Sequence, residues 1–177
     1  MSDQSTKHLW NNTGQNRPDF ALEPEPGQES VWDYPRPPVA RRDGRLVEVL
    51  CGGNVIATTT GCYKVMETAS PPTYYLPPQD VDQDFLVPAA GASVCEWKGA
   101  AVYWTLASKP GDPVAWSYPR PRPRFDVIKD YFAFYPGRVA CYVDGERVAP
   151  QPGRFYGGWI TSGVVGPFKG EPGTGHW

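Results

Sequence analysis

Hydrophobic and polar side chains alternate along many short stretches of the chain, with the two-residue period that is typical of β-strands. The alternation begins near residue 45 and continues to about residue 148, interrupted by glycine and proline. Gly52-Gly53-Asn54 and Asp144-Gly145 are turn sequences that predict two β-hairpins. The predicted strands cover residues 46–50, 55–57, 62–68, 74–76, 84–87, 93–97, 101–107, 114–116, 138–143 and 146–148.

Helical periodicity is found in one place. Phe125, Ile128 and Phe132 are spaced by three and four residues, which predicts a short helix over residues 125–132. The 21 prolines and 19 glycines leave little room for longer helices. The sequence therefore predicts an all-β, single compact domain of short antiparallel strands in two sheets, with one short helix and extended Pro/Gly-rich tails.

A chain of 177 residues is long enough for one domain with tails. Residues 1–30 are polar, proline-rich and without periodicity, so we expect a flexible N-terminal arm. Residues 31–148 form the predicted domain, and residues 149–177 form a Gly- and aromatic-rich tail that packs on it. The first thirty residues contain no basic start followed by an apolar run, so we expect a cytoplasmic protein with free thiols.

Charge excludes two classes of partner. The formal net charge of −2 provides no basic surface for nucleic acid or for an anionic membrane. No stretch approaches the roughly 20 apolar residues that a membrane span requires. We therefore expect neither nucleic acid nor membrane as a partner, and the sequence leaves the oligomeric state open.

Histidine is absent from the predicted domain. His8 and His176, the two histidines, lie in the tails, so the domain contains no Ser-His-Asp triad, Cys-His dyad or histidine metal site. Asp80, Asp82 and Asp84 alternate, which suggests a solvated face more than a divalent-metal site. The four cysteines, at positions 51, 62, 95 and 141, are too widely spaced for paired CxxC zinc motifs. We therefore predict no metal and no cofactor.

The most reactive stretch of the sequence is CEWKGAAVYW, which begins at Cys95. Gly99 is expected to mark a β-bulge that turns Lys98 and Tyr103 into one concavity. An ammonium near a thiol lowers the thiol pKa, so Cys95 is the candidate reactive cysteine. Glu67 lies on the same strand face as apolar side chains, and either it pairs with Lys98 or it reaches water at a strand end.

A six-residue pattern occurs twice, as WDYPRP from Trp32 and as WSYPRP from Trp116. In one interpretation, the aromatic side chains fix an extended proline segment to the domain. In the other, the Pro-Arg segments offer a polyproline helix to a partner protein. The first is favoured because the aromatic residues need burial.

Four ordered blocks, METASPPTYYLPPQDV, VCEWKGAAVYWT, AWSYPRPRP and FYPGRVACYVDGE, resemble the bacterial family known as domain of unknown function 427. The resemblance covers about residues 31–148 and implies a β-tent-like fold, a half-open arrangement of antiparallel sheets. Other β-tent families bind zinc through paired CxxC motifs, which this chain lacks. A nucleotidyltransferase-like label has been used for the family, but no Gly-Ser loop with paired acids follows here. The family's recurrent motif residues correspond to Glu67, Tyr74, Tyr75, Pro77, Asp80, Cys95, Lys98, Gly99, Tyr103, Trp104, Trp116, Tyr118 and Tyr135.

Three functions are compatible with these residues. The leading one is a module that binds a small molecule or peptide, planar or anionic, in an aromatic cleft. The second is an enzyme with Cys95 as nucleophile or Lys98 as imine-forming amine, and with Glu67 or Asp80 as base. The third is an adaptor that binds a protein through its Pro-Arg segments. The predicted ligand-binding residues are Glu67, Tyr74, Tyr75, Asp80, Lys98, Tyr103, Trp104, Trp116, Tyr118 and Tyr135.

Overall fold

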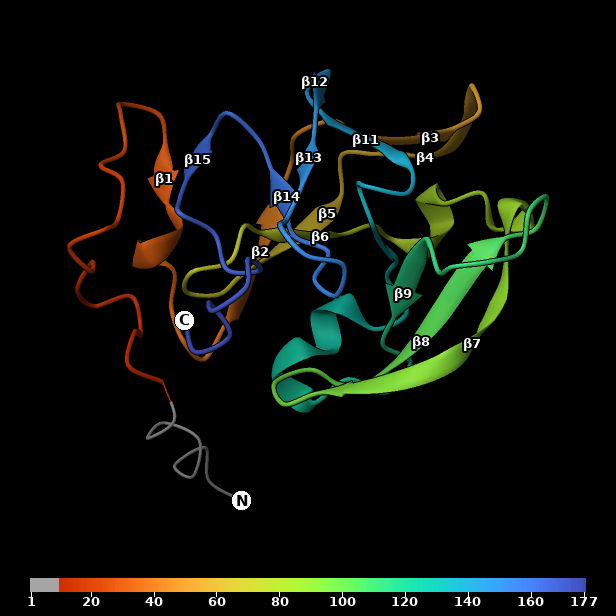
Figure 1. Cartoon of the computed structure of the whole chain (residues 1–177). Helices are drawn as coiled ribbons and strands as arrows, with labels where there is room; N and C mark the ends of the chain where they lie inside the picture. The colour runs from red at the N-terminus through yellow and green to blue at the C-terminus, as the bar shows by residue number, and fades with distance from the viewer. Residues whose placement is uncertain (1–9) are drawn as a thin grey trace.

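The computed structural model describes residues 10–177, whose regular secondary structure consists mainly of short strands (Figure 1). His8 and the first part of the predicted arm lie outside the described residues. In chain order the elements are β1 (Glu29–Ser30), η1 (Val31–Asp33), β2 (Val39–Asp43), β3 (Val47–Cys51), β4 (Asn54–Thr59), β5 (Cys62–Met66), β6 (Thr73–Tyr75), η2 (Pro78–Asp80), η3 (Gln83–Phe85), β7 (Leu86–Cys95), β8 (Gly99–Leu106), β9 (Ala115–Ser117), η4 (Pro123–Ile128), β10 (Ala133–Phe134), β11 (Ala140–Val143), β12 (Glu146–Arg147), β13 (Ala149–Pro150), β14 (Trp159–Ile160) and β15 (Val164–Val165).

The predicted all-β class is confirmed, but the strands of residues 10–177 form five sheets where two were predicted. Two antiparallel four-stranded sheets, in the orders β10-β9-β8-β7 and β12-β11-β3-β4, are the largest units. An antiparallel three-stranded sheet, β2-β5-β6, accompanies them. Two further pairs are formed by the chain ends: β1 runs parallel to β15, and β13 is antiparallel to β14.

The long β7–β8 hairpin differs from the sequence prediction in one respect. The two predicted strands 84–87 and 93–97 are replaced by the continuous strand β7, whose register shifts between Ala89 and Ala92. The bulge therefore lies around Gly91, which has a φ of 102°. Gly99, where the bulge was predicted, is instead the first residue of β8, with a φ of 106° that a hairpin end requires.

The predicted helix over residues 125–132 is a shorter 3₁₀ segment, η4, which ends at Ile128. Phe125 and Ile128 are buried, as their spacing predicted. Phe132 is also buried, but its backbone is extended because it exchanges hydrogen bonds of 2.8 and 2.9 Å with Leu76. Pairing with a distant strand thus overrides the local helical pattern.

Aromatic side chains dominate the interior. In the main core Trp159 stacks on Tyr74, with ring centroids 4.8 Å apart, and its indole donates to the Phe134 carbonyl. A second cluster surrounds Tyr75 and Trp116. The high aromatic content of the chain is therefore used mainly for packing between sheets.

Segments from both ends of the chain lie beside one another (Figure 1). A third cluster joins Trp32 to Phe20 and Trp177, with ring centroids 5.1–5.3 Å apart. Arg17 forms a bidentate pair with Asp33 at 2.8 Å. Residues 10–30 and 149–177 are thus both packed against the rest of the molecule.

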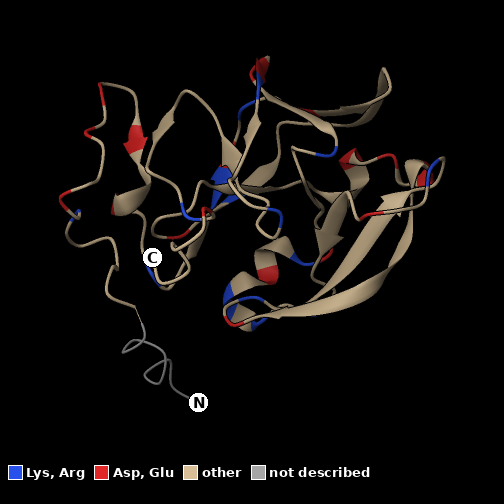
Figure 2. Cartoon of the chain, in the orientation of Figure 1, with Lys and Arg blue, Asp and Glu red and all other residues tan. Residues whose placement is uncertain are grey.

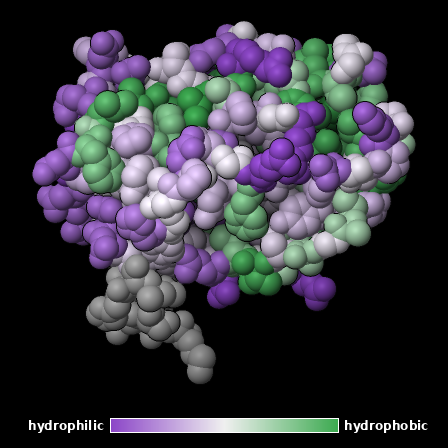
Figure 3. Space-filling model, in the orientation of Figure 1, coloured by the Kyte–Doolittle hydropathy of each residue, from purple (hydrophilic) through white to green (hydrophobic). Residues whose placement is uncertain are grey.

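Most of the surface in view is hydrophilic (Figure 3). A hydrophobic patch appears at the lower edge, over the β7–β8 hairpin. The exposed hydrophobic residues of this hairpin include Val94 and Val102.

Candidate functional site

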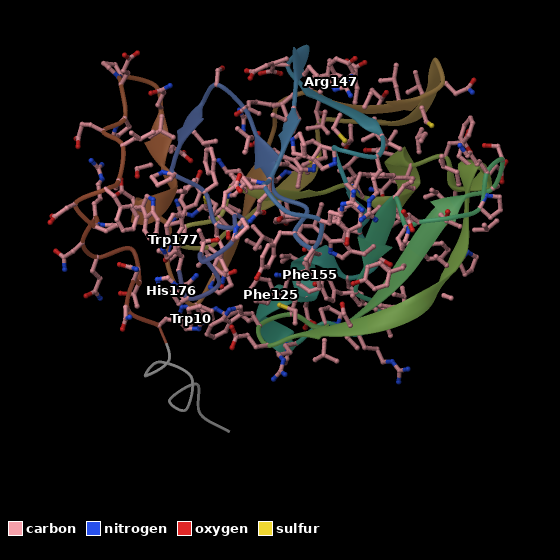
Figure 4. The ribbon with its side chains drawn as sticks, in the orientation of Figure 1. Trp10, Phe125, Arg147, Phe155, His176 and Trp177 are labelled. Atoms are coloured by element: carbon pink, nitrogen blue, oxygen red, sulfur yellow. The ribbon has the colours of Figure 1, made fainter. Side chains whose placement is uncertain are left out.

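A cleft of about 380 Å³ lies where three parts of the fold meet. One wall comes from β5 and β6, through Val65 and Tyr75, and a second comes from the sheet that contains the β7–β8 hairpin. The third is supplied by the chain ends, including Trp10 and Phe155, whose side chains are labelled in Figure 4. The volume is in the range of sites that hold small organic ligands.

Aromatic rings form most of the cleft wall. Tyr103 on β8 is the cross-strand partner of Trp116 on β9, so both side chains point to the same face of the sheet. Trp116 contacts Tyr135 and Tyr75, with ring centroids 4.6 and 6.3 Å away. The Tyr103 hydroxyl lies 2.6 Å from Ser93 Oγ. Burial raises the pKa of Tyr75 well above its usual value, and burial with the neighbouring Tyr103 raises that of Tyr135 to about 12.

Most of the predicted site residues meet at this cleft. The structure brings eight of them together in its lining: Glu67, Tyr75, Cys95, Lys98, Tyr103, Trp116, Tyr118 and Tyr135.

Three predicted residues do not line the cleft. Tyr74 precedes the cleft residue Tyr75 on β6, and Trp104 follows the cleft residue Tyr103 on β8. Their side chains therefore point to the opposite face of each strand. Trp104 packs against Phe132, with centroids 5.4 Å apart, and donates to Ser117 Oγ at 3.0 Å. Asp80 closes a turn and accepts a 2.6 Å hydrogen bond from Thr59.

Lys98 lies at the end of the β7–β8 hairpin, half-buried in the cleft lining. Its Nζ is 5.9 Å from the ring centroids of Tyr118 and Phe125. Burial lowers the pKa of Lys98, whereas Tyr118, Cys95 and the Glu67 carboxylate together raise it by more, so its pKa is above the ordinary value. The side chain is therefore a cation at neutral pH.

Glu67 has partners other than the predicted Lys98. Its Oε1 accepts a 2.9 Å hydrogen bond from the Trp97 indole and lies 3.4 Å from Arg36 Nε. Arg36 is held in place by carbonyl oxygens, at 3.1 Å from Asn12 and 3.0 Å from Thr68. The guanidinium reaches Glu67 because the two segments are adjacent in space, which sequence spacing does not reveal.

The sequence analysis missed a basic and aromatic cluster at the same cleft. Lys169 is 6% exposed, lines the cleft and donates to the Trp177 carbonyl at 3.2 Å. Its Nζ lies 4.5 Å from the Trp10 ring centroid, and Arg36 Cζ lies 4.1 Å from the same ring. Burial and the charge of Arg36 lower the pKa of Lys169. The Gly- and aromatic-rich composition of residues 149–177 was the sequence signal nearest to this cluster.

Residues 39–145 match the domain of unknown function 427 (DUF427), which is 107 of the 177 residues. The chain belongs to the DUF427 family. It matches no curated protein.

The DUF427 region supplies only part of the cleft. It contains the hairpin residues, Glu67 and the tyrosines, but Trp10, Gln151, Phe155 and Lys169 lie outside it. Residues outside the DUF427 region therefore complete the cleft wall.

The cysteines of this DUF427 protein are all free. Burial raises the pKa of Cys62 to about 12 and that of Cys141 further. Cys95 alone among the four lines the cleft. Within residues 10–177, no group of three or more His, Cys, Asp or Glu side chains is placed to hold a metal ion.

The two WxYPRP copies are anchored through their aromatic residues. Trp32 and Trp116 are buried in different clusters, as are Tyr34 and Tyr118. None of the described helices has the length and apolar character needed to cross a membrane.

Proposed function

We propose that this DUF427 protein is a binding module for a small organic molecule with a planar or anionic group. The observation that carries the proposal is the convergence of aromatic side chains and Lys98 in one cleft of about 380 Å³. Small-molecule sites are typically concave and mostly apolar, with a few polar groups that fix orientation. We further propose that it acts in the bacterial cytoplasm.

Each part of the lining has a role in this proposal. Tyr103 and Tyr135, which are half-buried in the lining, provide ring faces on which a planar group stacks. Lys98 provides the charge that attracts an anionic group. Glu67 stabilises the positions of Arg36 and Trp97, because Trp97 donates to its Oε1 and Arg36 Nε forms an ion pair with the same atom.

Binding is favoured over catalysis by the raised pKa of Lys98 and by the positions of the two candidate bases. An imine-forming lysine is activated by a lowered pKa, and the pKa of Lys98 is raised. Asp80, one of the two candidate bases for Cys95, does not line the cleft. The other, Glu67, is engaged by Arg36 and Trp97.

The proposal is tested by calorimetric titration with 1-naphthoate, a planar anion that fits the cleft volume. We expect saturable binding to the wild-type protein and a dissociation constant about tenfold higher for Tyr103→Ala, which loses ring contact. Trp104→Phe is the matched control, since residue 104 faces away from the cleft on the same strand. Equal dissociation constants for Tyr103→Ala and wild type, or no saturable binding, would contradict the proposal.

A further inference from the structure

Two unusually exposed hydrophobic side chains lie at the mouth of the cleft. Val94 on β7 is 74% exposed and Phe155 in the C-terminal segment is 70% exposed, more than any other large hydrophobic residue between positions 10 and 177. Both belong to the cleft lining, although they come from different parts of the chain. Tyr156 packs edge-on against Phe155, with centroids 5.1 Å apart. Single exposed hydrophobic residues are common, but the two most exposed ones at one opening form a hydrophobic rim.

The hairpin that carries Val94 has no charged side chain within β7 or β8. Figure 2 shows the same strands without Lys, Arg, Asp or Glu along their length, and charged residues near the end of the hairpin. Lys98 is one of those charged residues, in the turn between the strands. The wall formed by the two strands is therefore uncharged, and the charged residues of the cleft lining, Glu67, Glu96, Lys98 and Lys169, lie outside these strands.

Lys98 is available to a ligand. Among residues 10–177, no carboxylate oxygen lies within 4 Å of its Nζ. Glu67 is already engaged by Arg36, and Lys169 donates to a carbonyl oxygen. A half-buried ammonium with no carboxylate within 4 Å is stabilised by an incoming anion more than an exposed one.

We infer that the cleft takes an amphipathic organic anion, with its carboxylate at Lys98, its planar body against the aromatic wall and its alkyl tail between Val94 and Phe155. This inference rests on the proposed function. The side chains of the rim are apolar, so they contact an alkyl tail without needing hydrogen bonds from it. Binding would cover the two side chains that the folded chain leaves in water.

The tail is tested with a series of ligands of increasing length. Dissociation constants of benzoate, 4-butylbenzoate and 4-octylbenzoate are measured by calorimetry at one salt concentration. Each methylene that reaches the rim is expected to tighten binding about two- to fourfold. The double variant Val94→Ser with Phe155→Ser is expected to remove this dependence on length. Val55→Ser, at a 49% exposed valine outside the cleft, is the matched control.

The contribution of the anionic head group is tested by comparing a carboxylate with an uncharged amide. The uncharged 4-butylbenzamide is expected to bind wild type at least tenfold more weakly than 4-butylbenzoate, and Lys98→Met is expected to abolish that difference. Lys109→Met, at an exposed lysine outside the cleft, is expected to preserve it. The ratio of the dissociation constants of 4-butylbenzamide and 4-butylbenzoate is measured on the wild-type protein. The head group is therefore tested even if Lys98→Met fails to fold. Decanoate, which has the tail but no ring, is expected to bind more weakly than 4-butylbenzoate.

The outcomes separate this inference from the proposed function. If benzoate binding depends on Tyr103 but not on tail length, the cleft is a ligand site and the amphipathic inference is wrong. Equal binding of amide and carboxylate overturns the anionic head group, and equal or tighter binding of decanoate overturns the planar body. If no compound's binding depends on Tyr103, the proposed function itself fails.

Discussion

At the scale of single residues, Arg36 is the side chain that holds the basic end of the cleft together. Its side chain is 2% exposed, pairs with Glu67 at 3.4 Å and donates to three carbonyl oxygens, those of Asn12, Thr68 and Trp177. These acceptors come from distant parts of the sequence. One guanidinium thus fixes both chain ends beside the strand that carries Glu67.

We predict that Arg36→Met lowers the free energy of unfolding by about 3 kcal/mol, because it leaves Glu67 without its ion-pair partner and three carbonyl groups without their donor. Glu67→Gln should cost less, about 1 kcal/mol, since an amide oxygen still accepts from Trp97. Urea denaturation followed by tryptophan fluorescence measures both. Wild-type stability in Arg36→Met would show that the pair is not structural.

Lys169 leads to a prediction about pH. Because burial lowers its pKa in the folded state, the folded protein binds this proton less tightly than the unfolded chain, whose lysine keeps the ordinary value of 10.5. The contribution of Lys169 to stability therefore rises as pH increases through its lowered folded-state pKa towards 10.5. The free energy of unfolding of wild type minus that of Lys169→Met should increase between pH 7 and 10. A constant or falling difference would contradict the lowered pKa.

Strand alternation explains which site residues were predictable. Tyr74 and Tyr75 are adjacent on β6, and Tyr103 and Trp104 are adjacent on β8, so only one of each pair faces the cleft. The sequence pattern alone contains this constraint, yet the prediction included all four. Arg36 was not predictable in the same way, because its contact with Glu67 depends on how distant segments pack.

At the scale of elements, the C-terminal segment is fitted closely to β9. A Cβ atom on Gly157 would overlap the Trp116 ring, and one on Gly158 would overlap Pro71 and Gln151. Gly157 thus lets the backbone lie directly against the aromatic wall of the cleft.

We expect Gly157→Ala to destabilise the protein by about 1–3 kcal/mol, because the ring or the segment must move. Displacement of Trp116 should also weaken 1-naphthoate binding several-fold. Gly111→Ala is the matched control, since nothing lies within 4 Å of the added methyl group. Urea denaturation and calorimetry give the two readouts, and unchanged values for Gly157→Ala would show that the segment is not packed on Trp116.

Elements were predicted well where local signals agree with the sheets. The Asp144-Gly145 turn connects β11 to β12 as expected, with left-handed φ values of 48° and 80°. The segment 125–132 was predicted less well, since its apolar spacing suits a helix while Phe132 pairs with Leu76 across the fold. In this segment the apolar spacing correctly predicts which side chains are buried, but it predicts the wrong backbone conformation for Phe132.

At the scale of the whole molecule, the region that matches DUF427 does not contain the complete core. Trp159 lies outside residues 39–145, is fully buried and stacks on Tyr74 within that region. The N-terminal β1 pairs with β15 near the end of the chain. Both ends are therefore parts of the folded unit.

This arrangement predicts that Trp159→Ala lowers the free energy of unfolding by about 3–5 kcal/mol through a large cavity and a lost hydrogen bond to Phe134. A chain ending at residue 150 should lose cooperative thermal unfolding altogether. Calorimetric scans test both variants. A cooperative transition in the shortened chain would show that residues 39–145 hold a sufficient core by themselves.

The central claim is that the cleft binds a small molecule, and native mass spectrometry of the protein purified from its own cells tests it most directly. The account predicts a wild-type mass that exceeds the polypeptide, with the excess released on denaturation and absent from Tyr103→Ala and Lys98→Met. Trp104→Phe, altered on the opposite face of β8, should keep it. An excess mass that persists in Tyr103→Ala, or a wild-type mass equal to the polypeptide alone even after incubation with extract of those cells, would contradict the account.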